Sequence, residues 1–144
     1  MLLKGAKKKG VYTYIKHFAL NEQESNRSSN GNYSVFCSEQ AIRETYLKPF
    51  EISVKEAGAK GIMTSMNRIG TRQSMSHYGL LTSVLRNEWG FDGIVITDYV
   101  TGLDSDKLES ALSAGLDLQL NTNSTQVLSL DALKKSGVLR KLKE

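Results

Sequence analysis

Cysteine, proline and long apolar runs are scarce in this chain of 144 residues, which contains one cysteine and one proline. Because Cys37 is the only cysteine, the chain can form neither an internal disulfide nor a metal site built from several thiolates. No apolar run approaches the roughly 18 residues that a membrane-spanning helix needs. The N-terminal segment MLLKGAKKKG is basic, but no apolar segment follows it, so it lacks the pattern of a secretory signal. The compartment stays unknown, since a longer parent protein could carry its own signal.

Positive charge exceeds negative charge, with a formal net charge of +4. Part of the excess lies near the two ends, at Lys4, Lys7, Lys8 and Lys9 and at Lys134, Lys135, Arg140, Lys141 and Lys143. A nucleic-acid-binding surface would combine such charge with aromatic side chains that stack on bases. Neither basic run contains an aromatic residue, so we interpret both as solvated helix faces and expect no nucleic-acid partner.

Short β-branched or apolar segments alternate with segments whose apolar residues recur at helical spacing. The predicted strands cover residues 10–15, 60–65, 93–97 and 116–120. The predicted helices cover residues 39–57, 80–89, 105–115 and 127–133. Ser38 is a suitable N-cap for the first helix, which Pro49 should kink or divide near Lys48. This alternation is typical of parallel sheets with crossover helices, so we predict an α/β fold.

Polar residues follow each predicted strand, at the end where parallel α/β sheets bind their ligands. They are Lys16 and His17, then Ser65, Met66 and Asn67, then Asp98 and Tyr99, and finally Asn121. A loop between strand and helix needs a cap and a glycine rather than a Lys-His pair, which favours a functional site. The spacing alone names no reaction, and Asp98 taken by itself also fits an aspartate that accepts backbone N–H bonds in a loop.

Four segments, in order along the chain, resemble the family 3 glycoside hydrolases, the β-glucosidases and their relatives. They are IKHFALNEQESNR (15–27), YLKPFEISVKEAGAKGIMTSMNRIG (46–70), LLTSVLRNEWGFDGIVITDY (80–99) and SALSAGLDLQL (110–120). The resemblance implies a piece of the family's N-terminal (β/α)8 TIM barrel. A full barrel takes roughly 250 residues. The chain, residues 1–144, therefore corresponds to about four strand-helix units, approximately the second half.

The resemblance also implies roles for five residues. Asp98 falls on the nucleophile of a retaining β-glycosidase, which hydrolyses terminal β-D-glucosyl or xylosyl units through a covalent glycosyl-enzyme intermediate. Lys16 and His17 fall on the pair that binds sugar hydroxyls, and Met63 falls near the same subsite. Met66 stands where the family often has a tyrosine that supports the nucleophile. This is a departure, because a thioether donates no hydrogen bond.

The expected partner is a carbohydrate substrate, with no membrane contact. No spacing of His, Asp and Glu predicts a metal site, and no nucleotide fingerprint follows a strand, so we expect no cofactor. The resemblance places the acid/base in a following domain and further sugar-binding residues on preceding strands. We therefore expect a fragment that lacks the other barrel half and the C-terminal domain of its parent enzyme, and that has little or no activity alone.

Two alternatives stay open. The chain could be a non-catalytic truncated remnant, or a sugar-binding fragment, because it lacks the acid/base. It could also be a doubly wound, receiver-like domain with Asp98 as phospho-acceptor. That second alternative requires an acidic pair near the end of the first strand, where Lys16 and His17 stand instead.

Overall fold

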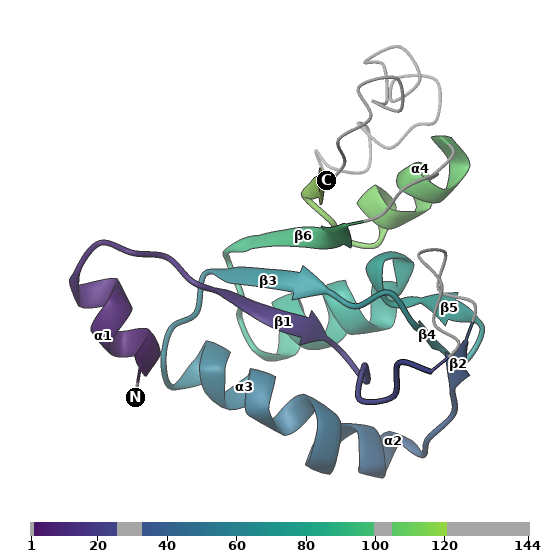
Figure 1. Ribbon diagram of the computed structural model, residues 1–144, viewed down its shortest axis with the longest axis horizontal. Coiled ribbons are helices and arrows are strands. Elements are labelled where there is room, and N and C mark those ends of the chain that lie inside the picture. The colour runs from purple at the N-terminus through teal and green to yellow at the C-terminus, as the bar shows by residue number, and fades with distance from the viewer. Residues whose placement is uncertain (1, 26–32, 100–104, 121–144) are drawn as a thin grey trace.

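The computed structural model describes residues 2–25, 33–99 and 105–120, and its centre is a parallel sheet (Figure 1). Four strands form this sheet: β1 (Tyr14–Phe18), β3 (Gly61–Thr64), β6 (Ile94–Tyr99) and β7 (Leu118–Leu120). They pair in the order β1-β3-β6-β7, and every pairing is parallel. The order follows the chain without the reversal that defines a doubly wound sheet. The predicted α/β class is confirmed, and the arrangement is that of an open segment of a barrel.

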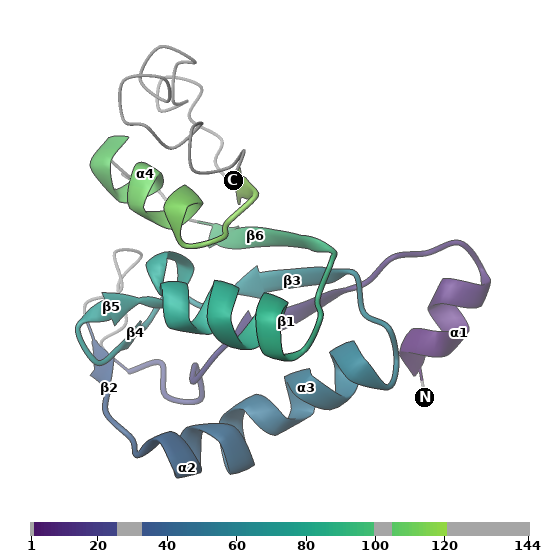
Figure 2. The ribbon, with the colours of Figure 1, turned by 180° about the vertical axis from the view of Figure 1, so that it is seen from behind.

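Helices lie mainly behind this sheet, as Figure 2 shows from the rear. The described helices are α1 (Leu2–Lys8), α2 (Glu39–Ala41), η1 (Ile42–Leu47), α3 (Lys48–Lys55), η2 (Ser74–Ser76), η3 (Gly79–Glu88) and α4 (Ser105–Ser113). Of these, η1 and η3 are π-helices and η2 is a 3-10 helix. The predicted helix at 127–133 and the strand-end residue Asn121 lie outside the described residues.

The first crossover helix confirms the predicted N-cap and the predicted division near Pro49. Its N-cap is Ser38, whose Oγ accepts a hydrogen bond from the Ala41 N–H at 3.2 Å. Residues 39–55 then run as three consecutive helical pieces. The change from π-helical to α-helical geometry falls between Leu47 and Lys48, next to Pro49. Proline has no N–H to donate, so the helix divides where the sequence predicted.

The bounds predicted for the first strand were wrong. Residues 10–13 lie outside β1, and Val11 and Tyr12 are exposed. Pairing begins only at Tyr14, which lies opposite Gly61 at the start of β3. Without a neighbouring strand to pair with, the β-branched and aromatic residues before Tyr14 do not extend the sheet. Lys16 and His17 consequently lie within the strand rather than after it.

A small second sheet was not predicted at all. Its strands are β2 (Ser34–Val35), β4 (Arg68–Ile69) and β5 (Arg72–Gln73), in the order β2-β4-β5. Gly70, with φ at +59°, begins the two-residue turn between β4 and β5. This sheet lies beyond the carboxyl ends of β1 and β3 (Figure 1). It shapes the loops that surround the candidate site.

The hydrophobic core fills the space between one face of the parallel sheet and the helices. Phe18, Ile62 and Val95 face this core from three strands and are fully buried. The Phe18 ring packs edge-on against Phe50, with 5.0 Å between ring centroids, and is tilted against the Trp89 ring, with 5.9 Å between centroids. Edge-to-face aromatic packing adds to the stability gained from burial. The end of β1 is therefore firmly attached to the helix layer.

The opposite face of the sheet is only partly covered. Side chains alternate between the two faces of a strand, so the neighbours of the core residues point away from the helices. Tyr14, Ile94 and Leu118 lie on this second face and are 42%, 48% and 52% exposed. In a closed barrel this face would be the interior.

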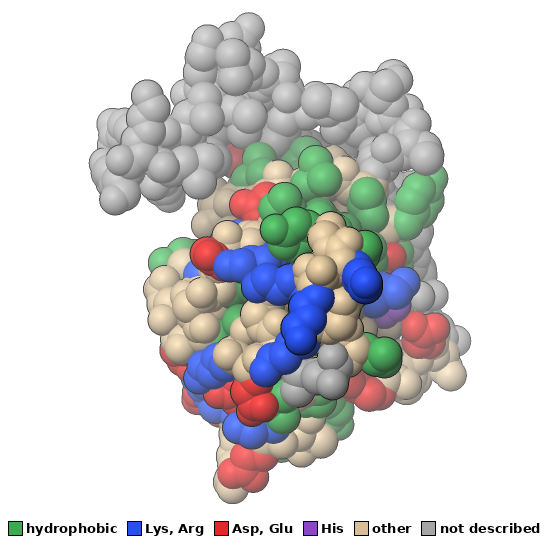
Figure 3. Space-filling model, turned by 90° about the vertical axis from the view of Figure 1, so that its left-hand side faces the viewer, with side chains coloured by type: hydrophobic (Ala, Val, Ile, Leu, Met, Phe, Trp, Pro, Cys, Tyr) green, Lys and Arg blue, Asp and Glu red, His purple; other side chains and the backbone are tan. Residues whose placement is uncertain are grey.

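Basic side chains gather across the side of the molecule that carries α1 (Figure 3). Lys4, Lys7 and Lys8 are exposed on α1, and that helix has no buried residue. A solvated face is what the sequence predicted for this basic run. The C-terminal basic run lies outside the described residues. No helix in the described part of the chain is long and apolar enough to cross a membrane.

We predict that Gly93→Ala lowers the free energy of unfolding by about 1–3 kcal/mol. A Cβ at this position would lie 2.7 Å from Lys60 Cα and 2.6 Å from its carbonyl carbon, where β6 begins beside β3. Urea denaturation followed by circular dichroism measures the change.

Gly5→Ala is the matched control, because it adds the same methyl group where nothing lies within 4 Å. Alanine is the better helix former, so this variant should be as stable as the parent or more stable by up to about 1 kcal/mol. Equal stability of the two variants would contradict the close approach of β6 to β3.

Candidate functional site

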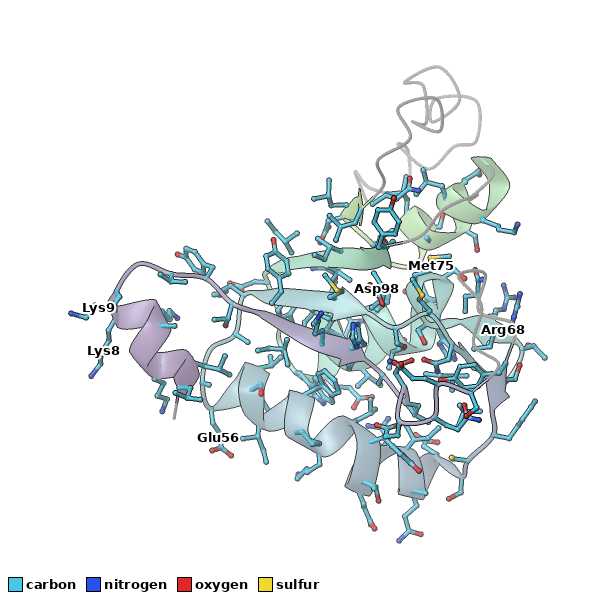
Figure 4. All side chains as sticks on the ribbon, in the orientation of Figure 1. Lys8, Lys9, Glu56, Arg68, Met75 and Asp98 are labelled. Carbon is cyan, nitrogen blue, oxygen red and sulfur yellow. The ribbon has the colours of Figure 1, made fainter. Side chains whose placement is uncertain are left out.

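The candidate site lies at the carboxyl end of the parallel sheet, where a carboxylate and an imidazole meet. Asp98 is the next-to-last residue of β6, and Figure 4 shows it near the middle of the molecule. Its Oδ2 lies 3.4 Å from Nε2 of His17 on β1. Strands β1 and β6 flank β3 and are therefore roughly 10 Å apart. The two side chains thus meet across β3.

A local irregularity of β1 accompanies this contact. The register between β1 and β3 shifts between Ile15 and Phe18, so the regular ladder is interrupted at His17. The peptide bonds that precede His17 and Ala19 are both cis. Bulges of this kind redirect a side chain at the rim of a sheet. Here Phe18 enters the core while His17 reaches toward β6.

The two carboxylate oxygens of Asp98 have different partners. Oδ1 accepts a hydrogen bond from the Tyr99 N–H at 2.7 Å, and Oδ2 faces His17. The first contact is what a loop-fixing aspartate would make, whereas the second joins two distant strands. The side chains of His17 and Asp98 are 24% and 17% exposed. The pair is therefore partly sheltered yet open to a ligand.

Lys16, Met63 and Met66 lie at different positions relative to the pair of Asp98 and His17. Lys16 is exposed on β1 and makes no ion pair with any described residue, so the structure does not bring its ammonium group to Asp98. Met63 is partly exposed and lies opposite Ile96 in the β3–β6 register. Met66 packs against the hydrophobic core from the loop after β3.

Sequence reasoning missed the role of a buried polar group beside the site. Ser65 and Asn67 were noted only as polar residues after a strand, and Ser74 was not noted at all. All three are at most 2% exposed and are linked by hydrogen bonds. The position of Ser74 could have been predicted from Gly70 and Thr71. These two residues stand between two short polar strands, a pattern that is typical of a β-hairpin.

A hollow of about 830 Å³ lies elsewhere and does not include Asp98 or His17. It is lined mainly by η3, α4 and the segment that precedes β7. Within it, Arg86 donates to the Gly115 carbonyl at 2.9 Å and to Asp117 at 2.8 Å. Asp117 also accepts from the Val95 N–H at 2.7 Å. These bonds tie the amino ends of β6 and β7 together, which is a structural role.

His77 has a structural role at the start of η3. Its Nδ1 accepts a hydrogen bond from the Leu80 N–H at 3.1 Å. Only the neutral imidazole can accept this bond. Burial lowers the pKa of His77 below its ordinary value of 6.5. The neutral form is therefore the one that the fold stabilises. Among the described residues, no cluster of His, Cys, Asp and Glu could hold a metal ion.

The sequential parallel strands, the helices on one face and the ionisable pair at the carboxyl ends define the class of protein. They form a segment of a (β/α) barrel whose candidate site lies at the rim where barrel enzymes hold their active sites. Comparison with known protein families agrees. The model for the glycosyl hydrolase family 3 N terminal domain matches residues 1–143. The chain belongs to this family.

Curated relatives match most of this chain with a small part of their own length. A β-glucosidase from Rhizobium radiobacter is 41% identical over 118 residues, which are 82% of this chain and 14% of the relative. An exo-alpha-(1->6)-L-arabinopyranosidase from Bifidobacterium longum is 44% identical over 124 residues, 86% of this chain and 16% of the relative. The chain thus spans about one-seventh of the length of the relatives it matches.

Solved structures of β-glucosidases have the same fold over this region. The β-glucosidase of Kluyveromyces marxianus superimposes with a TM-score of 0.82 and 28% identity, over 97% of this chain and 16% of that one. β-Glucosidase 3B of Thermotoga neapolitana, in complex with glucose, gives a TM-score of 0.78 and 34% identity, over 98% and 19%. The predicted partial TIM barrel of family 3 is therefore confirmed.

We predict that protonation of His77 destabilises the fold at acidic pH. A group whose pKa is lower in the folded state favours folding when it is deprotonated. Its contribution is complete above the unfolded pKa of about 6.5 and is lost as the pH falls through the folded value.

The variant His77→Asn keeps a side-chain acceptor for the Leu80 N–H but does not titrate. Urea unfolding of both proteins between about pH 5 and pH 8 separates this effect from all other titrating groups, which the two proteins share. The parent should lose stability relative to the variant below about pH 6.5. A difference that does not change with pH would contradict the capping role.

Proposed function

We propose that this chain supplies the nucleophile and part of the sugar-binding subsite of a retaining β-glycosidase. Membership of family 3 supports the reaction class, and the contact of Asp98 with His17 across β3 carries the assignment of residues. Asp98 attacks the anomeric carbon with an oxygen lone pair, and the glycosidic C–O bond breaks. The departing oxygen takes a proton from a second carboxyl group. Water then hydrolyses the glycosyl-enzyme ester and regenerates both groups.

His17 and Lys16 are proposed to bind hydroxyl groups of the sugar. A neutral imidazole offers one donor and one acceptor, and an ammonium group offers three donors, so the pair can match adjacent hydroxyls. The exposure of Lys16 and its lack of an ion pair among the described residues leave it available for this role. Met63 and Met66 are proposed to contribute apolar contact beside β3, as sugar-ring C–H groups require.

The acid/base is proposed to lie outside these 144 residues. A retaining mechanism needs a second carboxyl group about 5 Å from the nucleophile. In the described part of the chain, the side chain that faces the Asp98 carboxylate is the imidazole of His17, which is not a carboxyl group. We therefore propose that the full-length parent protein completes the site with its remaining barrel strands and a further domain, and that the isolated chain hydrolyses no aryl glycoside.

Two classes of glycoside fit the comparisons. The β-glucosidase relatives favour a terminal β-D-glucosyl unit, or a xylosyl unit as a smaller analogue. The arabinopyranosidase relative, at 44% identity, favours a terminal pentopyranosyl unit instead. Sugar binding without turnover is a second candidate for the isolated chain. It is favoured by Met66, which packs against the core and cannot donate a hydrogen bond to Asp98.

We predict that an activated 2-fluoro β-glucoside labels Asp98 of the full-length protein that contains these residues. Fluorine at C2 slows hydrolysis of the intermediate, so the ester accumulates and peptide mass spectrometry locates it. Asp98→Asn should abolish labelling and lower kcat/KM for aryl glycosides by a factor on the order of 10⁴ or more. The same assay with aryl glucoside, xyloside and arabinopyranoside substrates distinguishes the sugar classes.

Asp92→Asn is the matched control for this experiment. Asp92 precedes β6 at the opposite end from Asp98, is paired with Lys60, and is 72% exposed. The variant should label and hydrolyse substrate as the parent does. A label on any residue other than Asp98 would refute the assignment of the nucleophile.

A further inference from the structure

The backbone carbonyls at the end of β1 accept hydrogen bonds from buried polar residues in the loop after β3. The Phe18 carbonyl accepts a hydrogen bond from the Ser65 N–H at 2.8 Å. The Ala19 carbonyl accepts two, from the Ser65 hydroxyl at 2.8 Å and from Nδ2 of Asn67 at 3.2 Å. Three donors from two residues thus fix two successive carbonyls directly after His17.

Ser74 completes this group from the short helix η2. Its hydroxyl lies 2.8 Å from the Ser65 hydroxyl and donates to the Asn67 carbonyl at 3.0 Å. The Ser74 N–H donates to the same carbonyl at 3.0 Å. Ser65, Asn67, Ser74 and Ala19 are all at most 2% exposed. Water does not reach these bonds, which link the residues into one buried network.

Two energetically unfavourable features lie within this group of residues or directly next to it. Leu20, which is 1% exposed, has φ at +61°, a left-handed conformation that is unfavourable for a leucine. Oδ1 of Asn67 is buried and has no hydrogen-bond partner among the described residues. Such costs persist only where the surrounding structure enforces them, and they concentrate at functional sites. Their position beside His17 indicates that this segment is shaped for the site rather than for stability.

Phe18 connects these buried polar residues to the pair of His17 and Asp98. Phe18 is fixed at both ends, by its ring in the aromatic core and by its carbonyl on Ser65. His17 precedes Phe18 at the point where the register of β1 shifts. Its imidazole can therefore lie 3.4 Å from Asp98 only while the Phe18–Ala19 segment keeps this path.

We propose that Ser65 and Asn67 are positioning residues that hold the end of β1 so that His17 faces Asp98, with Ser74 holding both in place. The functional consequence rests on the function proposed above. The placement of His17 can be tested without it. The residues touch neither the sugar nor the reacting atoms, and act on the site through His17.

Nuclear magnetic resonance of the 144-residue chain tests the placement. The chain contains two histidines, His17 and His77, so ring signals are readily assigned. In the otherwise unmodified 144-residue chain, Asp98→Asn should move the His17 ring signals, because the two side chains are in contact. In a Ser65→Ala background, the same change should move these signals far less. A contribution to stability alone would not remove this coupling, which the double-mutant cycle isolates.

Ser53→Ala is the matched control, since it removes a hydroxyl that donates to the Pro49 carbonyl at 2.8 Å away from the site. It should leave the response of His17 to Asp98→Asn unchanged. If Ser65→Ala does not give a folded chain, Ser65→Cys keeps most of the volume and weakens the donor. An undiminished response of His17 in the folded Ser65 variant would overturn the proposal.

Kinetics of the full-length protein supply an independent readout. Ser65→Ala should lower kcat/KM for an aryl glycoside by about tenfold to a hundredfold, as small displacements of a positioned group do. The same change in a His17→Ala background should have little further effect. An equal loss in both backgrounds would contradict action through His17. An enzyme with no glycosidase activity would contradict the proposed function alone, because the resonance experiment would still decide the placement.

Discussion

The position of β3 between β1 and β6 is the constraint on which the candidate site depends. Parallel pairing on both sides of β3 sets β1 and β6 in register and ends all three strands at the same edge. His17 and Asp98, which are 81 positions apart in the chain by subtraction of their numbers, can then meet over the end of β3. The two residues are not neighbours in the sequence. Their contact is a property of the sheet.

The two faces of the sheet are energetically unequal, as expected for an open segment of a barrel. One face buries Phe18, Ile62 and Val95 against the helices, at about 25 cal/mol for each Å² of apolar surface removed from water. The other face leaves Tyr14, Ile94 and Leu118 about half exposed. Exposed apolar side chains on a parallel sheet are expected where further strands close a barrel around them.

The alternation of strands and helices was predictable because it depends on local periodicity. Three of the four strands and the helix after Ser38 followed from apolar spacing and capping residues. The start of β1 was not predictable, because it depends on where β3 begins. The small sheet of β2, β4 and β5 was missed because two-residue strands carry no periodicity. Strand boundaries of this kind are decided by the partner strand rather than by propensity.

The candidate site was predictable in its residue types but not in its geometry. The charged and ionisable residues near strand ends singled out His17 and Asp98, and the resemblance to family 3 gave them roles. The sequence grouped Lys16 with His17, whereas in the structure it is His17 that reaches the carboxylate. The burial of Ser65, Asn67 and Ser74 was not predicted, because serine and asparagine side chains are mostly exposed. The β4–β5 hairpin returns the chain so that Ser74 lies beside Asn67.

Three aspartates at the ends of strands show how position decides the role of a carboxylate. Asp92 and Asp117 lie at the amino ends, where each faces a cation: Lys60 for the first and Arg86 for the second. The hydrogen bond from Lys60 lowers the pKa of Asp92. Asp117 shares Oδ2 between Arg86 and the Val95 N–H.

Asp98, at the carboxyl end, has no such cation among the described residues and directs one oxygen at an imidazole. A carboxylate that is already neutralised by an arginine and a backbone N–H is a poor nucleophile, because its charge is committed to the fold. A carboxylate beside a histidine that can itself bind a hydroxyl group keeps a lone pair for chemistry. The same residue type therefore stabilises the sheet at the amino end, and at the carboxyl end it is the group that we propose as the nucleophile.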